Sequence, residues 1–175
     1  QNWLMTDISL ESINHFKKNL KVKAATNIIS FKKINVIDNI EKINFNNFDI
    51  VTGSAFLDIM PRKWFKDFCK LNTNTKIIYF SINYDGFFKF TPKHKDDELV
   101  LKLFNKDQKS DKGIGLRAVG QDCTNIINTV FSKTHKTYVF NSDWMVENNK
   151  AFQEIFINFC ENVIKKNQTN NLNEW

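Results

Sequence analysis

Residues 48–60, FDIVTGSAFLDIM, are the part of the sequence that decides the fold. Phe48 to Ser54 form a mostly apolar run that breaks at Gly53, which is typical of a strand buried on both faces of a parallel sheet. Pro61 then opens a helical stretch that ends at Leu71 and carries its aromatic residues at helical spacing. A buried strand followed directly by an amphipathic helix predicts an α/β fold with a mainly parallel sheet.

The alternation of strands and helices continues on both sides of this stretch. Further strands are predicted at 2–8, 27–31, 76–83 and 136–146, and further helices at 9–20, 96–107, 121–133 and 148–166. Residues 87–90 are predicted to extend the 76–83 strand as a hairpin. Since there is no internal repeat and no interdomain linker, we expect a single domain over 1–166, followed by a polar tail over 167–175.

The composition excludes several classes of protein. Seventeen phenylalanines and four tryptophans in 175 residues provide enough apolar surface for one sizeable core, which excludes a disordered chain. Five glycines and three cysteines exclude collagen-like and disulfide-scaffold proteins. The cysteines lack a CxxC pair, which is typical of reduced thiols in a cytoplasmic protein, and no apolar run approaches the roughly 20 residues of a membrane span.

The net charge is positive, with 25 lysines and arginines against 19 acidic residues, which gives +6. The lysines are spread along the chain, and the two arginines, Arg62 and Arg117, are far apart. Because nucleic-acid interfaces cluster such residues on one face, we do not expect nucleic acid as the partner. An RNA-binding or RNA-modifying protein is retained as an alternative on the charge and the scattered aromatic residues.

Ligands of parallel sheets bind at the carboxyl ends of the strands, so the residues there are the first candidates for a site. Asp7 ends the first strand and could accept hydrogen bonds from ribose hydroxyls or could cap the following helix. Ser54 and Ala55 form a small-residue turn that a ligand could approach closely, or that is simply close-packed. Asp58 lies near the next helix, where it could serve chemistry or interact with the helix dipole.

Two later segments also carry polar residues suited to a site. Tyr84 and Asp85 follow the 76–83 strand and could orient a substrate, although Asp85-Gly86 is also an ordinary hairpin turn. Residues 104–115, FNKDQKSDKGIG, predict either a flexible substrate lid or a solvated connection. The three histidines are isolated from one another in the sequence, and we expect no metal site.

Taken in order, these segments resemble class I S-adenosylmethionine-dependent methyltransferases, in particular a little-characterised bacterial group. In that group the fourth strand reads like DLVTASALLDLV, and TYDG, FNxHQxxDKGFG and S-x-W segments follow. This chain has DIVTGSAFLDIM, INYDG, FNKDQKSDKGIG and Ser142-Asp143-Trp144 in the same order. The resemblance covers nearly the whole chain and rests on the combination of motifs.

The resemblance implies a Rossmann-like sheet that is mostly parallel, with antiparallel strands near the C-terminus and helices on both faces. It implies methyl transfer from S-adenosylmethionine to a small molecule, a reaction that depends mainly on alignment of the acceptor with the sulfonium. The implied cofactor-binding residues are Asp7 and Ile8 at the ribose, Asn35 and Val36 beside the adenine, and Ser54 and Ala55 at the methionine part. The implied catalytic residues are Asp58, Tyr84 and Asp111, and the implied substrate-binding residues are Asp85, Asn105, Gln108 and Lys112.

One departure from the family concerns the glycine-rich cofactor loop after the first strand of the family's sheet. All five glycines lie between 53 and 120, so this loop, its strand and its helix are missing before Asp7. Three explanations stay open: the segment lies upstream, another chain supplies the strand, or the core has rearranged. We expect weak or absent S-adenosylmethionine binding by this 175-residue form, and a homodimer through the sheet edge that the missing strand exposes. A non-catalytic adaptor with this fold is a further alternative.

Overall fold

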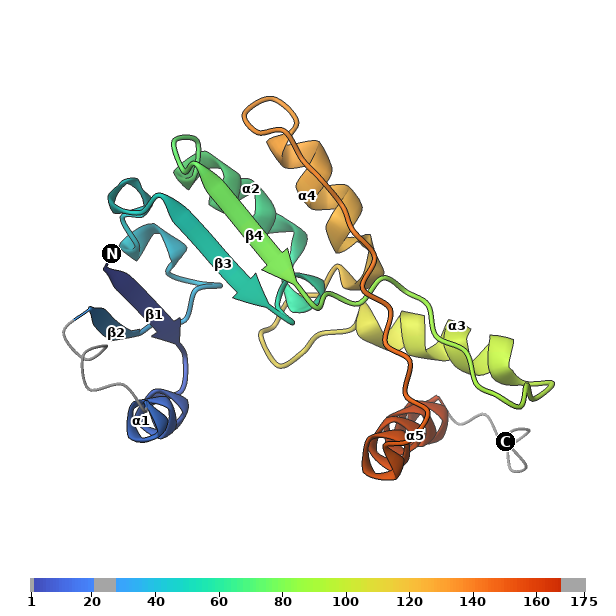
Figure 1. Cartoon of the computed structure of the whole chain (residues 1–175). Helices are drawn as coiled ribbons and strands as arrows, with labels where there is room; N and C mark the ends of the chain where they lie inside the picture. The colour runs from blue at the N-terminus through green and yellow to red at the C-terminus, as the bar shows by residue number, and fades with distance from the viewer. Residues whose placement is uncertain (1, 21–27, 168–175) are drawn as a thin grey trace. The chain divides into compact units, whose positions relative to one another are not determined.

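The computed structural model describes residues 2–20 and 28–167, and this part of the chain is an α/β structure with five α-helices and two small parallel sheets (Figure 1). It divides into two compact units, Gln1–Asn47 and Phe48–Trp175. The α/β class predicted from the alternation of strands and helices is therefore confirmed. Of the expected C-terminal tail, only Asn167 belongs to the described residues.

The first unit is a two-stranded parallel sheet with one helix. Strands β1 (Trp3–Asp7) and β2 (Ile29–Lys33) pair in parallel, with Asp7 opposite Lys33 at their carboxyl ends. Helix α1 (Leu10–Asn19) begins after Ser9, whose hydroxyl accepts a hydrogen bond from the Ser12 amide at 3.2 Å. Ile13 of this helix is buried, and two short 3₁₀ turns, η2 (Ile40–Lys42) and η3 (Phe45–Asn47), each bury one apolar residue.

The sheet of the second unit pairs β3 (Ile50–Ser54) with β4 (Ile77–Ser81) in parallel. One face packs on helix α2 (Arg62–Leu71), where the rings of Phe68 and Phe80 lie 5.8 Å apart. The opposite face exposes Ile50, Ile77 and Tyr79. In the described part of this unit, helices therefore cover one face of the sheet, whereas the sequence predicted helices on both.

The second unit has two clusters of buried side chains. In the first, α2 packs against α4 (Cys123–Phe131), with Trp64 and Phe68 stacked at 4.6 Å and Phe68 against Phe131 at 5.7 Å. In the second, α3 (Asp97–Gln108) packs against α5 (Lys150–Lys166). This second cluster contains Val100, Leu103, Phe104, Cys160 and Val163, and is flanked by Tyr84, Phe88, Phe90 and Phe156.

Two predicted strands are wrong. Residues 87–90 form no hairpin: the Asp85 carboxylate accepts a hydrogen bond from the Phe87 amide at 3.0 Å, and Phe88 packs on Phe104 and Phe156. Residues 136–146 are extended but belong to neither described sheet (Figure 1), so the expected antiparallel strand near the C-terminus is not formed. Both segments have strand-like sequences, but tertiary packing or the lack of a neighbouring strand decides their conformation.

Candidate functional site

The carboxyl ends of β3 and β4 are joined by hydrogen bonds and carry unusual backbone conformations. Ala55 has a φ of 50° and Ile82 has a φ of 55°, so both lie in the left-handed region. Residues other than glycine rarely adopt this conformation, and a β-branched residue such as Ile82 adopts it least readily. The Ala55 amide donates to the Ser81 carbonyl at 3.0 Å, and the Leu57 amide donates to the Asn83 side-chain oxygen at 3.0 Å. Such strained residues concentrate at functional sites, which favours this end of the sheet as a site.

Tyr84 links two of the predicted motifs directly. Its hydroxyl donates to Asn105 Oδ1 at 2.7 Å, and Asn105 Nδ2 donates to the Gly86 carbonyl at 2.9 Å. Asn105 lies on α3, so this side chain fixes the turn after β4 against that helix. Burial, with a contribution from Asp85, raises the pKa of the Tyr84 phenol well above its usual value. The phenol is therefore neutral near pH 7 and suits a positioning role better than that of a base.

Asp58 is the most unusual acidic group in the second unit. It lies on the short 3₁₀ turn η4 (Leu57–Ile59), which contacts the turn η5 (Gly120–Asp122) and α4. Its Oδ1 atom is buried and has no hydrogen-bond partner among the described residues. Burial raises the pKa of this carboxyl, while the positive charge of Lys112 acts to lower it. A buried acceptor without a donor is an expensive feature, and it makes Asp58 the best candidate for accepting a hydrogen bond or proton from a ligand.

Two residues that the sequence analysis missed lie in the same neighbourhood. Cys123 is fully buried, with its sulfur 4.0 Å from the Tyr84 carbonyl, and burial followed by the charge of Asp58 raises its pKa. Gln121 lies on η5, and its Oε1 atom is a second buried acceptor without a partner in the described part of the chain. A Cβ atom on Gly86, where φ is +96°, would come within 2.8 Å of Gln121. Only glycine fits at position 86, because any larger residue would collide with Gln121 and would be strained at this positive φ. The Asp85-Gly86 pair in the sequence does not indicate this contact.

The loop after α3 is held by its own charged residues. Lys112 donates to the Asp107 carbonyl at 2.8 Å and to the Asp107 carboxylate at 3.1 Å, and Lys166 of α5 reaches the same carboxylate at 2.6 Å. Although burial acts to raise it, the two lysines hold the pKa of Asp107 below its usual value. The Asp111 carboxylate accepts from the amides of Gly113 and Ile114 at 2.9 and 2.8 Å. Lys112 and Asp111 thus stabilise the loop, and Asp107 organises it although the sequence analysis passed over it.

The remaining predicted substrate-binding residues differ in their surroundings. Asp85 is exposed and closes the turn to Phe87. Gln108 is half-buried at the last position of α3. The structure therefore joins Tyr84 to Asn105 by a hydrogen bond and brings Lys112 within electrostatic range of Asp58, and it places Asp85 and Asp111 in local turns.

In the first unit, the predicted residues lie at the carboxyl end of the β1–β2 sheet. Asp7 Oδ1 accepts from the Ser9 amide at 2.7 Å, which uses one carboxylate oxygen at the entrance to α1. Ile8 is exposed and Val36 is half-buried. The side-chain oxygen of Asn35, expected beside an adenine, accepts from the Ile37 amide at 3.0 Å, and its nitrogen donates to Asp38 at 2.6 Å. A local turn therefore occupies both ends of the Asn35 amide.

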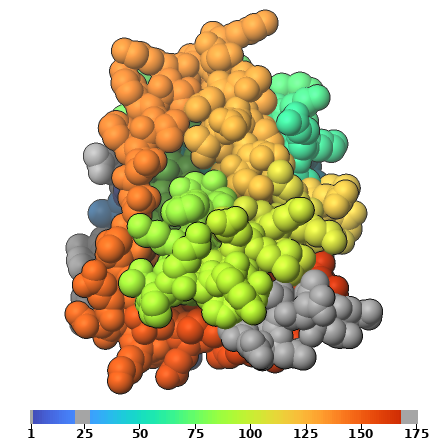
Figure 2. All heavy atoms as spheres, turned by 90° about the vertical axis from the view of Figure 1, so that its right-hand side faces the viewer, coloured from blue at the N-terminus to red at the C-terminus, as the bar shows by residue number. Residues whose placement is uncertain are grey.

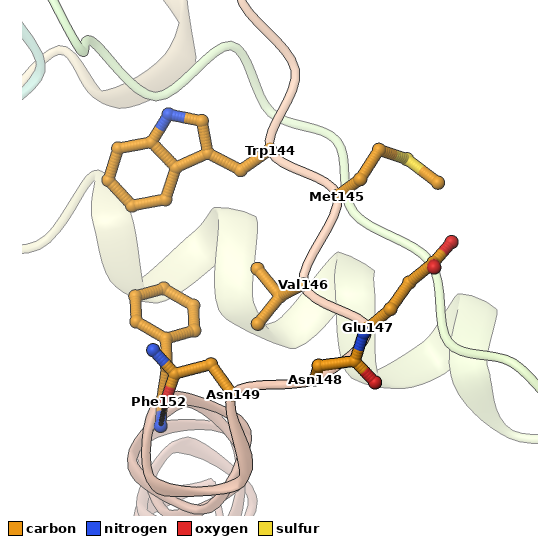
Figure 3. Close-up of a pocket in the computed structure, with 7 residues that line it drawn as sticks. All are labelled: Trp144, Met145, Val146, Glu147, Asn148, Asn149 and Phe152. Carbon is orange, nitrogen blue, oxygen red and sulfur yellow. Dashed lines mark hydrogen bonds between the residues drawn. The ribbon is translucent and has the colours of Figure 1, made fainter.

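A surface hollow of about 740 Å³ lies elsewhere in the second unit (Figure 3). The rings of Trp144 and Phe152 face each other edge to face at 5.7 Å along one side of it. It is lined by Trp144, Met145, Val146, Glu147, Asn148, Asn149 and Phe152. None of these is a predicted catalytic or binding residue, and Trp144 belongs to the Ser142-Asp143-Trp144 motif.

The described ranges contain no group of three histidine, cysteine or acidic side chains that could hold a metal ion. Within the same ranges, no helix has both the length and the apolar character needed to cross a membrane.

Comparison of the chain with protein-family models, curated proteins and solved structures gives no match.

Proposed function

We propose that the protein to which this chain belongs carries out S-adenosylmethionine-dependent methyl transfer to a small molecule, with Asp58 at the site of the acceptor and with weak or absent cofactor binding by the 175-residue form alone. The observation that supports this most is the hydrogen-bonded connection between three separate motifs at the carboxyl ends of β3 and β4. Leu57 is bonded to Asn83, Tyr84 to Asn105, and Asn105 to Gly86. Motifs distant in sequence are thus joined where ligands of parallel sheets bind.

The residues at the end of β3 fit the methionine part of the cofactor. Ser54 and Ala55 are exposed, and Ala55 presents only a methyl group on a left-handed turn, which leaves room for close approach to the backbone. When bound, S-adenosylmethionine supplies a methyl group activated by its sulfonium.

Asp58 is suited to receive the proton that an acceptor hydroxyl or amine loses on methylation. Its buried oxygen has no competing donor in the described structure, and its raised pKa brings it closer to neutrality, where proton transfer is most effective. Tyr84 and Asn105 hold the neighbouring turn in place through the hydrogen bonds from Tyr84 to Asn105 and from Asn105 to the Gly86 carbonyl.

The test measures S-adenosylhomocysteine release by the full natural chain incubated with S-adenosylmethionine and pools of small hydroxyl and amine compounds. Asp58→Asn should reduce turnover about a hundredfold, the lower end for a lost general base, without weakening cofactor binding measured by calorimetry. Asp49→Asn is the matched control, because Asp49 pairs with Lys76 at the protein surface. Absence of both cofactor binding and product from the full natural chain contradicts the proposal and favours the adaptor.

A further inference from the structure

Two contacting turns of the second unit each carry a buried side-chain oxygen that has no hydrogen-bond donor among the described residues. The two oxygens are Asp58 Oδ1 on η4 and Gln121 Oε1 on η5. A third such atom, Asn128 Oδ1, belongs to α4. Because a buried acceptor without a donor costs free energy, these atoms need an explanation, and a ligand that brings the donors provides one.

The backbone holds Asp58 and Gln121 on the same side of one contact. The Val119 amide donates to the Met60 carbonyl at 3.0 Å, and the adjoining pair of residues forms an antiparallel bridge. Asp58 lies two residues before Met60, and Gln121 lies two residues after Val119. Because the two chain segments run antiparallel here, both residues lie on the same side of this hydrogen bond.

The two oxygens lie close to the surface of the second unit. Asp58 and Gln121 are half-buried residues, although the oxygens themselves are buried. Figure 2 shows the chain that leads from α3 into η5, in lime and yellow, on the facing surface beside α4. A small polar group therefore has only a short distance to cover from solvent to these turns.

The donors near Asp58 are directed to other acceptors. The positive charge of Lys112 acts on Asp58, but its ammonium donates to the Asp107 carbonyl at 2.8 Å and to the Asp107 carboxylate at 3.1 Å. The Cys123 thiol, which also interacts with Asp58, has the Tyr84 carbonyl as its acceptor at 4.0 Å. The site therefore lacks hydrogen-bond donors and is rich in acceptors.

We propose that Asp58 and Gln121 bind a primary amino group of the methyl acceptor, an inference that rests on the proposed methyl transfer. A hydroxyl has one O–H group and can donate to only one of the two oxygens, whereas a protonated primary amine has three N–H groups. After one proton has passed to Asp58, the neutral amine still has an N–H group for each oxygen, and its lone pair is free to react. A hydroxyl that has lost its proton has no donor left.

The reaction of such an amine balances with one proton and one methyl group. The ammonium gives a proton to the Asp58 carboxylate, and the nitrogen lone pair then forms a bond to the methyl carbon of S-adenosylmethionine. The electron pair of the broken carbon–sulfur bond stays on sulfur. The products are a secondary ammonium, S-adenosylhomocysteine and protonated Asp58, which then loses its proton to water.

The test measures binding of amines to this chain by heteronuclear NMR titration without S-adenosylmethionine, with the side-chain amide signal of Gln121 as the local reporter. The probes are propylamine, hexylamine and benzylamine. Each is compared with the alcohol of the same carbon skeleton and with the corresponding trimethylammonium ion, which has the charge but no N–H group. An amine should bind at least about tenfold more tightly than both of its counterparts, the ratio that about one additional hydrogen bond gives.

Variants assign this binding to the two oxygens. Asp58→Asn and Gln121→Leu should each weaken amine binding about tenfold, whereas Gln121→Glu keeps an acceptor at the same position and should retain binding. Asp49→Asn is the control, because it removes a carboxylate that pairs with Lys76 at the surface, and it should leave amine binding unchanged. In the ligand-free protein, Gln121→Leu should raise the thermal unfolding midpoint, because it removes a buried acceptor that no described residue satisfies.

The outcomes distinguish the amine site from the methyl transfer itself. An absence of amine binding, or equal binding of amines and their alcohols or trimethylammonium ions, overturns the amine site even where the full natural chain methylates other compounds. A lower unfolding midpoint for Gln121→Leu overturns it as well, because Gln121 then has a partner within the protein. Amine binding that depends on Asp58 and Gln121, without any methyl transfer, supports the amine site and contradicts only the proposed reaction.

Discussion

Gly53→Ala is expected to destabilise the second unit, although alanine is normally the better residue in a regular element. A Cβ atom at position 53 would lie 2.7 Å from Cε1 and 2.9 Å from Cδ1 of the Phe80 ring. That ring cannot move freely, because it is stacked at 6.3 Å on Phe56 and packed edge-on at 5.8 Å against Phe68.

The magnitude follows from two opposing effects. Forcing an extra methyl group into a packed core costs about 1–3 kcal/mol. Replacing glycine in a strand returns about 0.5–1 kcal/mol through reduced backbone entropy. The net loss in the free energy of unfolding therefore spans about 0–2.5 kcal/mol with a centre of about 1 kcal/mol, which at a urea dependence of about 2 kcal/mol per M lowers the unfolding midpoint by about 0.5 M.

The assay is urea unfolding followed by circular dichroism, with Ser54→Ala as the control because Ser54 is an exposed neighbour on the same strand. Combining Gly53→Ala with Phe80→Leu should cost at least about 1 kcal/mol less than the sum of the two single changes, because the smaller side chain makes room. A Gly53→Ala variant as stable as the wild type would refute the packing explanation and return Gly53 to the ligand-approach interpretation.

Two further predictions concern the α3–α5 cluster and its ion pairs. Cys160 is fully buried, and burial raises the pKa of its thiol to about 12. A thiol reagent at pH 8 should therefore modify the half-exposed Cys69 first, and should modify Cys160 only as fast as the second unit unfolds. Peptide mapping of the modified protein measures both rates. Cys160 modified at the rate of Cys69 would contradict this. Because the pKa of Asp107 is lowered in the folded protein, its ion pairs with Lys112 and Lys166 stabilise the fold at neutral pH. This stabilisation is lost as the pH falls from the pKa of an unfolded aspartate, about 4, through the lower pKa of Asp107 in the folded protein. Asp107→Asn should therefore cost about 1–2 kcal/mol at pH 7, discounted for the exposure of Lys166, and acid unfolding scans should show the difference from the wild type shrinking as the pH falls through the folded pKa.

Much of the helical structure could be predicted because its signals are local. The apolar spacing of α2 and α5 identified both helices, and the capping residues Ser9 and Asn149 explain why α1 and α5 begin one or two residues inside the predicted ranges. The extended 136–146 segment was predicted as a strand for the same local reasons. A strand forms only where a second strand lies beside it to pair with, and the local sequence of a segment does not indicate whether such a strand is present.

The candidate site was predictable as a set of motifs but not as a network. Asn105 was identified, yet its two hydrogen bonds, with Tyr84 and with Gly86, join positions 21 and 19 residues away. Asp107 was passed over because its second partner, Lys166, is 59 residues distant. The role of Gly86 depends on Gln121, and an Asp-Gly pair gives no indication of that contact.

The division into two compact units affects how the stability of this protein is measured. Each unit has buried side chains of its own, so the two can lose structure at different denaturant concentrations, and one free energy then describes neither. The tryptophans report the units unequally: Trp64 is 4% exposed in the core of the second unit, whereas Trp3 of the first unit is 48% exposed. Tryptophan fluorescence will follow mainly the second unit, and far-ultraviolet circular dichroism will register both, so a mismatch between the two curves measures the independence of the units.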